Sequence, residues 1–184
     1  GVDVSGIAVD PMMPTGSAFV RYRADGSRDF VYNIATSAAA RFGWTAAVAS
    51  LVARAGHLHV MGSALSMPNA WGVIERAAEV IKARGGSLSL DPNLRKELRY
   101  DDATEAQFAR LVAMSDLLLP SGEELERAAG VAGEAAAVAR LLDMGVTEVV
   151  LKRGADGATC FRRDGRTEAT AFVVDELDPT GAGD

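Results

Sequence analysis

The chain has 184 residues, 48% of them hydrophobic and 24% charged, so it can bury a core and is expected to form one globular domain, or most of one. Nineteen Lys and Arg residues against 25 Asp and Glu residues give a net charge of −6, which disfavours nucleic-acid binding. The single cysteine, Cys160, excludes an intrachain disulfide and favours a reducing, cytoplasmic compartment, and the absence of a long apolar run argues against a membrane partner.

The first predicted element is a hairpin over residues 17–33. Two runs rich in Phe, Val and Tyr, 18–22 and 29–32, flank the segment 24–27, in which Asp-Gly supplies the positive φ of a tight turn. Alternation places Phe19, Arg21 and Arg23 on one face and Val20 and Tyr22 on the other. We therefore expect a small two-stranded sheet that the core covers only in part.

From residue 57 onward, short apolar strands alternate with amphipathic helices. The strands are predicted at 58–62, 87–90, 116–119 and 148–152, and the helices at 68–84, 102–114, 121–129 and 133–144. Asp102 and Glu105 are the expected capping pair of the second helix. Two further strands are predicted at 157–161 and 169–174, joined by a turn at 162–166. This succession predicts an α/β fold with a mostly parallel sheet and helices on both faces.

The last residues, 178–184, carry two glycines around a small residue, followed directly by an aspartate. At Gly181, Ala182 and Gly183 the backbone can approach an anion closely and point several N–H groups at its oxygens. Asp184 can then act as a base on the hydroxyl that attacks the phosphorus, which phosphoryl transfer requires. The competing interpretation is a glycine turn capped by an aspartate.

The pattern Asp-x-Thr-Gly-Ala-Gly-Asp over 178–184 resembles the C-terminal signature of the PfkB/ribokinase carbohydrate kinases. The resemblance implies a ribokinase-like three-layer α/β/α sandwich with a small β-sheet lid: a single, incomplete domain over residues 1–184 with the lid hairpin at about 14–34. It implies that Asp184 is the catalytic base and that 181–183 form the anion hole. It also implies ATP and Mg²⁺ as cofactors and leaves a monovalent cation open.

The segment Asp91-Pro92-Asn93-Leu94-Arg95 resembles the Asp-x-Asn-x-Arg motif that many family members place at the ligand crevice. The resemblance implies that Asn93 and Arg95 contact ATP and that Arg95 also contacts the substrate and the transferred phosphate. A guanidinium suits a phosphate, and ligands bind beyond the carboxyl ends of parallel strands. The alternative is a Pro-Asn turn with a surface arginine.

The segment 151–157 resembles the strand and turn that border the nucleotide in this family, which implies Lys152, Gly154 and Gly157 as ATP-binding residues. An ordinary hairpin turn would also favour glycine at these positions. The segment 120–124 falls where the family has an Asn-x-x-Glu motif, so Glu124 is implied to help bind ATP and to hold magnesium through water. Ser121 replaces the asparagine, and Ser121 with Glu124 also reads as a capping box.

The hairpin matches the family's lid in order and spacing, which makes Tyr32 and Asn33 candidate sugar contacts. The alternative is a buried lid aromatic and a solvent-facing amide. The lid also permits a homodimer. The motifs together look closest to the 2-keto-3-deoxygluconate and ketohexose kinase branch. The Tyr-x-Arg of keto-deoxy-sugar kinases would fall at Val31 and Asn33, however, so a neutral ketose such as tagatose or fructose stays open.

Other kinds of function are less well supported. His57 and His59 alternate on a predicted strand without nearby carboxylates, which favours a packed or hydrogen-bonded pair over a metal site, and Cys160 is more typical of a core residue than of a nucleophile. Neither a Walker P-loop nor an early Rossmann Gly-x-Gly-x-x-Gly occurs. The remaining rival is a non-catalytic sugar- or nucleotide-binding protein with the kinase fold.

The family has further elements at both ends of the region that this chain resembles. If the chain ended at Asp184, a free carboxylate would lie at the anion hole, and the helix whose N-terminus should attract phosphate would be missing. We therefore expect the 184-residue polypeptide to be inactive by itself and the full-length protein to be a kinase.

Overall fold

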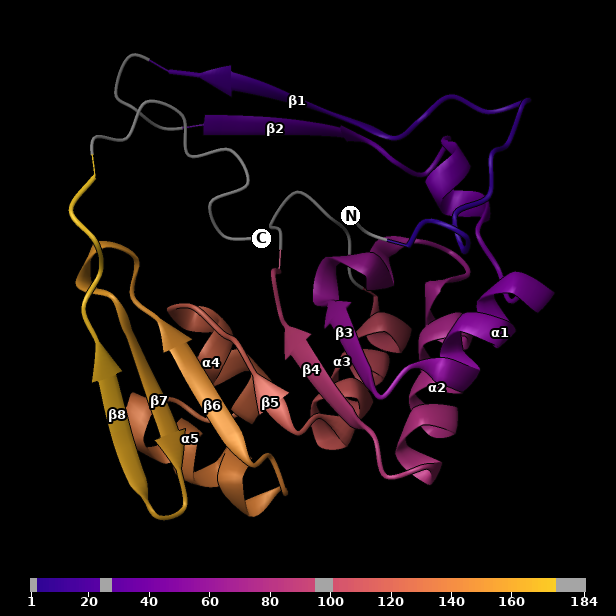
Figure 1. The fold of residues 1–184 in the computed structure, drawn as a ribbon. Helices are drawn as coiled ribbons and strands as arrows, with labels where there is room; N and C mark the ends of the chain where they lie inside the picture. Colours follow the sequence, from indigo (N-terminus) through magenta and orange to yellow (C-terminus); the bar gives the residue numbers. More distant parts are fainter. Residues whose placement is uncertain (1–2, 24–27, 95–100, 175–184) are drawn as a thin grey trace.

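The computed structural model describes residues 3–23, 28–94 and 101–174, and its largest feature is a six-stranded sheet of order β3-β4-β5-β6-β7-β8 (Figure 1). Four strands run parallel: β3 (His57–Met61), β4 (Ser87–Asp91), β5 (Leu117–Leu118) and β6 (Glu148–Lys152). Two more extend the sheet antiparallel: β7 (Ala158–Arg162) and β8 (Gly165–Ala169). The expected α/β class with a mostly parallel sheet is confirmed.

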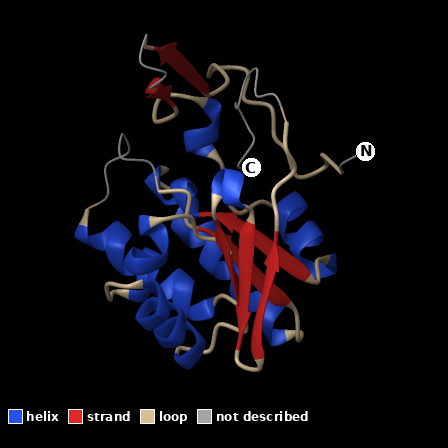
Figure 2. Ribbon diagram, turned by 90° about the vertical axis from the view of Figure 1, so that its left-hand side faces the viewer, coloured by secondary structure: helices blue, strands red, loops and turns tan. Residues whose placement is uncertain are grey.

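The helices are α1 (Ala46–Arg54), α2 (Ala70–Ala83), α3 (Asp102–Met114), α4 (Glu123–Ala129) and α5 (Glu134–Asp143), with short 3-10 turns η1 (Ala38–Arg41), η2 (Gly62–Ser66) and η3 (Gly154–Asp156). Within the described ranges, α2 to α5 form one layer on a single face of the sheet (Figure 2). The reason is topological: β3 to β6 follow one another in space as in sequence, and right-handed crossovers in one direction place the helices that connect these strands on the same side.

The strand pattern divides the sheet into an apolar face and a polar face. Side chains that pack against the helices are at most 3% exposed: Leu88, Leu90, Leu118, Val149 and Leu151. On the opposite face, the Nδ1 and Nε2 atoms of His57 lie 2.7 and 2.8 Å from the hydroxyls of Ser87 and Ser89, and His59 Nδ1 lies 2.7 Å from Ser89. The prediction of a hydrogen-bonded histidine pair is confirmed.

The predicted hairpin forms a separate sheet of β1 (Ser17–Tyr22) and β2 (Arg28–Asn33), although its turn, 24–27, lies outside the described residues. Figure 1 shows it beyond the carboxyl ends of the large sheet. Phe19 pairs with Val31 on one face, and the two side chains are 64% and 65% exposed. The core therefore covers this two-stranded sheet only in part, as expected.

Two local predictions are wrong. The last strand is 165–169 rather than 169–174: Ala169 pairs with Ala158, the first residue of β7, so the β-prone Phe172 and Val173 have no partner strand there and are fully exposed. The N-cap of α3 is Asp101, one residue before the expected Asp102.

The Asp101 carboxylate accepts the backbone N–H of Thr104 at 2.8 Å and its hydroxyl at 2.6 Å, and these contacts lower the pKa of Asp101. Among the helices of the described ranges, none is both long and apolar enough to serve as a membrane span.

The single core predicts unequal costs for two truncations. Leu111→Ala removes a completely buried side chain of α3 and should lower the free energy of unfolding by about 2–5 kcal/mol, because a cavity remains. Val131→Ala changes a side chain that is 39% exposed and should cost less than about 0.5 kcal/mol. Urea unfolding measures both; equal losses would show that α3 does not pack in this core.

Candidate functional site

The site lies where the carboxyl ends of β4, β5 and β6 meet. Asp91 ends β4, Lys152 ends β6, and the chain that leaves β5 passes between them at Ser121, which forms a parallel bridge with Lys152. The backbone N–H of Lys152 donates to Pro120 O at 2.8 Å. Since β5 ends at Leu118, the longer strands β4 and β6 extend past it, and side chains on them can meet above it.

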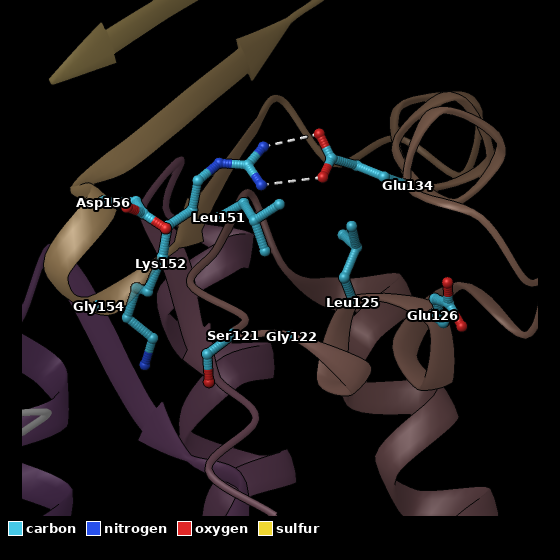
Figure 3. Close-up of a pocket in the computed structure, with 10 residues that line it drawn as sticks. Ser121, Gly122, Leu125, Glu126, Glu134, Leu151, Lys152, Gly154 and Asp156 are labelled. Carbon is cyan, nitrogen blue, oxygen red and sulfur yellow. Dashed lines mark hydrogen bonds and ion pairs between the residues drawn. The ribbon is translucent and has the colours of Figure 1, made fainter. Parts of the chain in front are cut away.

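A pocket of about 500 Å³ opens beside this junction, between the start of α4, the start of α5 and the β6–β7 connection. Its lining is Ser121, Gly122, Leu125, Glu126, Glu134, Leu151, Lys152, Arg153, Gly154 and Asp156 (Figure 3). Leu125 and Leu151 supply an apolar wall, whereas the Lys152 side chain points away from these two leucines (Figure 3). The volume lies within the range of small-molecule sites.

The Lys152 ammonium bridges to Asp91 across β5, with Nζ 2.5 Å from Asp91 Oδ2. The Asp91 side chain is 8% exposed and the Lys152 side chain 32%. A buried carboxylate requires such a partner, because desolvation otherwise penalises its charge. The ion pair thus holds the Lys152 side chain at the carboxyl edge, and the part of the chain that the structure describes uses one of its three N–H donors for this.

The other oxygen of Asp91 shapes the turn that follows β4. Oδ1 accepts the backbone N–H of Asn93 at 3.1 Å, and Asn93 takes a positive φ of 39°, which asparagine tolerates better than most residues. Pro92 is wedged against the start of η2, since a Cβ on Gly62 would lie 2.2 Å from Pro92 O. The expected Asn93 site is therefore a constrained turn at the crevice.

Glu124 ties this turn to the β5–α4 connection. Its Oε1 accepts Leu94 N–H at 2.9 Å, and its Oε2 accepts the N–H and the hydroxyl of Ser121 at 2.9 and 2.8 Å. The Ser121 and Glu124 box is confirmed. A carboxylate has about four acceptor positions, and three are used here, so Oε1 keeps one for a water.

Gly154 and Gly157 have different reasons to be glycine. Gly154 has φ +58° and open space where a Cβ would lie, whereas a Cβ on Gly157, at φ +90°, would lie 2.0 Å from Ala169 O. Gly154 also lines the pocket. The structure therefore gives Gly157 a packing role against β8 and leaves Gly154 beside the ligand space.

Arg153 and Glu134 were not predicted from the sequence, and they close one side of the pocket (Figure 3). The guanidinium donates two hydrogen bonds to the carboxylate, at 2.7 and 3.0 Å. These bonds lower the pKa of Glu134 and raise that of Arg153. The two residues are 19 positions apart, and no spacing rule connects a helix start with a turn after the next strand.

The remaining candidate site residues lie on the hairpin or outside the described ranges. Tyr32 is half-buried and stacks on Phe30 at 5.8 Å between ring centroids, and Asn33 Oδ1 accepts the Thr36 hydroxyl at 2.6 Å. The predicted residues that lie outside the described ranges are Arg95, Gly181, Ala182, Gly183 and Asp184. Among the described residues, no group of three or more His, Cys, Asp or Glu side chains could hold a metal.

Comparison with known proteins gives a consistent result. A family model described as pfkB family carbohydrate kinase matches residues 1–184. The 2-dehydro-3-deoxygluconokinase of Thermoproteus tenax is 31% identical over 189 residues, which cover 100% of this chain and 57% of the relative. Fructokinase-1 of Oryza sativa subsp. japonica is 32% identical over 187 residues, with 100% and 58% covered.

A crystal structure from E. coli of a protein provisionally named ribokinase II, in complex with ATP and Mg²⁺, superposes with a TM-score of 0.84 at 32% identity. The match covers 94% of this chain and 55% of that one. The ribokinase-like fold is therefore shown, and the chain spans little more than half the length of the relatives that it matches.

The two glycines of the β6–β7 connection predict a contrast in stability. Gly154→Ala should cost about 1–2 kcal/mol, because alanine disfavours the left-handed conformation although there is room for its methyl group. Gly157→Ala should cost clearly more, because the methyl group also meets the Ala169 carbonyl. Thermal unfolding of both variants decides this; a smaller loss for Gly157→Ala would refute the packing role.

Proposed function

Because the chain belongs to the pfkB family of carbohydrate kinases, we propose that the whole protein transfers the γ-phosphoryl group of ATP to a hydroxyl group of a sugar or keto-sugar. The observation that carries this proposal is the pocket of about 500 Å³ at the carboxyl edge of the sheet, whose lining includes Lys152 beside its ion pair with Asp91. Polyanions bind at such an edge in parallel α/β folds. This is the chemistry that the family's name describes.

Lys152 is the pocket cation best suited to meet the phosphates of ATP. Arg153 also lines the pocket, but its guanidinium is paired with Glu134 through two hydrogen bonds. Lys152 gives one N–H to Asp91 and keeps two for phosphate oxygens. Gly154 lets the backbone lie close to the same anion, as its position in the lining indicates.

The chemical step is assigned to residues outside the described ranges. Asp184 takes the proton of the sugar hydroxyl as its oxygen attacks the γ-phosphorus, and the N–H groups of 181–183 and the Arg95 guanidinium stabilise the charge that develops. Bound Mg²⁺ would neutralise phosphate charge. Among the described residues, Glu124 Oε1 accepts one hydrogen bond, and its second acceptor position fits a magnesium-bound water, since Mg²⁺ keeps several waters.

The substrate is proposed to be a keto-sugar. Two relatives are named for 2-dehydro-3-deoxygluconate and for fructose, and a tagatose-like ketose fits the same chemistry. Tyr32 and Asn33 on the inner part of the lid remain the proposed sugar contacts. The exposed pair Phe19 and Val31 supports a homodimer through the lid, and the cytoplasmic compartment and a monovalent cation stay predictions.

The function is tested with full-length protein in a coupled ADP-release assay across ketoses and keto acids, with Mg²⁺ present. The proposal requires sugar-dependent ADP release for at least one of them. Thermal stabilisation by ATP or a sugar without any turnover would instead identify a non-catalytic binding protein with the kinase fold.

The base assignment predicts the effect of Asp184→Asn in full-length protein. Turnover should fall about 10²–10⁴-fold, because a positioned base contributes that much, while the KM for the sugar changes little. Asp164→Asn, in the exposed turn between β7 and β8, is the matched control and should retain full turnover. Comparable losses in turnover and in sugar affinity for Asp184→Asn would contradict a base.

A further inference from the structure

The loops at the carboxyl edge are joined by a closed ring of contacts. Asp91 binds Lys152, whose backbone bridges to Ser121; Ser121 donates to Glu124. Glu124 accepts Leu94 N–H, and the turn from Leu94 leads back to Asp91. Three connections that are far apart in sequence are thereby held to one another by two carboxylates.

Asp91 is the residue of this ring whose two carboxylate oxygens contact two different segments. Its Oδ2 holds the Lys152 side chain at the carboxyl edge, and its Oδ1 holds the 91–94 turn through Asn93 N–H. Lys152 has four rotatable bonds, and without a partner it would lose that fixed position. Asp91 is too buried, at 8% side-chain exposure, to contact a large ligand itself.

We infer that Asp91 is a positioning residue, which holds Lys152 in place for the nucleotide phosphates and ties that position to the turn after β4. The inference rests on the proposed function for the identity of the ligand. It differs from a purely structural role, because removal of the Asp91 charge should then weaken nucleotide binding only when Lys152 is present.

The chain offers a matched control in a second lysine–aspartate pair. Lys82 Nζ lies 2.7 Å from Asp116 Oδ1, and Asp116 Oδ2 also accepts the backbone N–H of Leu88 at 2.8 Å. This pair has the same two-way contact pattern, but Asp116 precedes β5, at the amino edge of the sheet, away from the pocket.

The experiment compares four variants of the full-length protein: Asp91→Asn, Lys152→Met, the double variant and Asp116→Asn. Asp91→Asn keeps an oxygen that can accept Asn93 N–H and removes only the charge that holds Lys152. It should raise the KM for MgATP and the Kd for a non-hydrolysable ATP analogue about tenfold, with the sugar KM within twofold. The double variant should be no worse than Lys152→Met, since both substitutions break one interaction. Asp116→Asn should leave both constants within twofold.

The outcomes separate the inference from the function. If wild-type protein turns over sugar but Asp91→Asn behaves like Asp116→Asn, the inference is wrong and the proposed kinase function stands. The same conclusion follows if the effects of the Asp91 and Lys152 substitutions multiply in the double variant. If wild-type protein binds the analogue without turnover and Asp91→Asn weakens that binding tenfold, the inference holds and the kinase function fails. Absence of any analogue binding to wild-type protein overturns both.

Discussion

The parallel pairing of β3, β4, β5 and β6 in chain order is the constraint on which the rest of the structure depends. Each crossover moves one strand further in the same direction, so the helices between these strands, α2 to α5, return on one face and the four parallel strands end at one edge. The helices pack on the apolar face of the sheet. Polar side chains at the strand ends, among them Asp91 and Lys152, are thereby gathered above the short strand β5.

A buried carboxylate that connects two strands lowers stability, because its charge must be desolvated. Removing one partner of a buried ion pair typically costs about 3–5 kcal/mol, although the one-third exposure of Lys152 reduces that figure here. Two apolar side chains could fill the space between β4 and β6 without a desolvation penalty. The ion pair instead holds a cation at the carboxyl edge, and the described residues use only one of its N–H donors, which suits a polyanionic ligand at this edge.

Much of this fold follows from the sequence because hydrophobic periodicity and turn residues are local signals. The strand at Glu148–Lys152 and the helix at Asp102–Met114 agree with their predicted bounds, and Ser121 with Glu124 forms the expected box. Contacts over long distances were not predictable. Asp91 and Lys152 are 61 residues apart, and their meeting depends on strand order and on where β5 ends. The residues after Ala169 looked like a strand because β-propensity carries no information about an available partner.

The central claim is that the carboxyl edge beside Lys152 is the nucleotide site. Hydrogen–deuterium exchange of the full-length protein, with and without a non-hydrolysable ATP analogue and Mg²⁺, tests it most directly. The account predicts slower exchange in the segments 121–126 and 151–156, which contain most of the pocket lining, and no change at the amino edge around Asp116. Protection confined to the separate pocket between η2 and the start of α3, which Trp71 and Gln107 help to line, would contradict it.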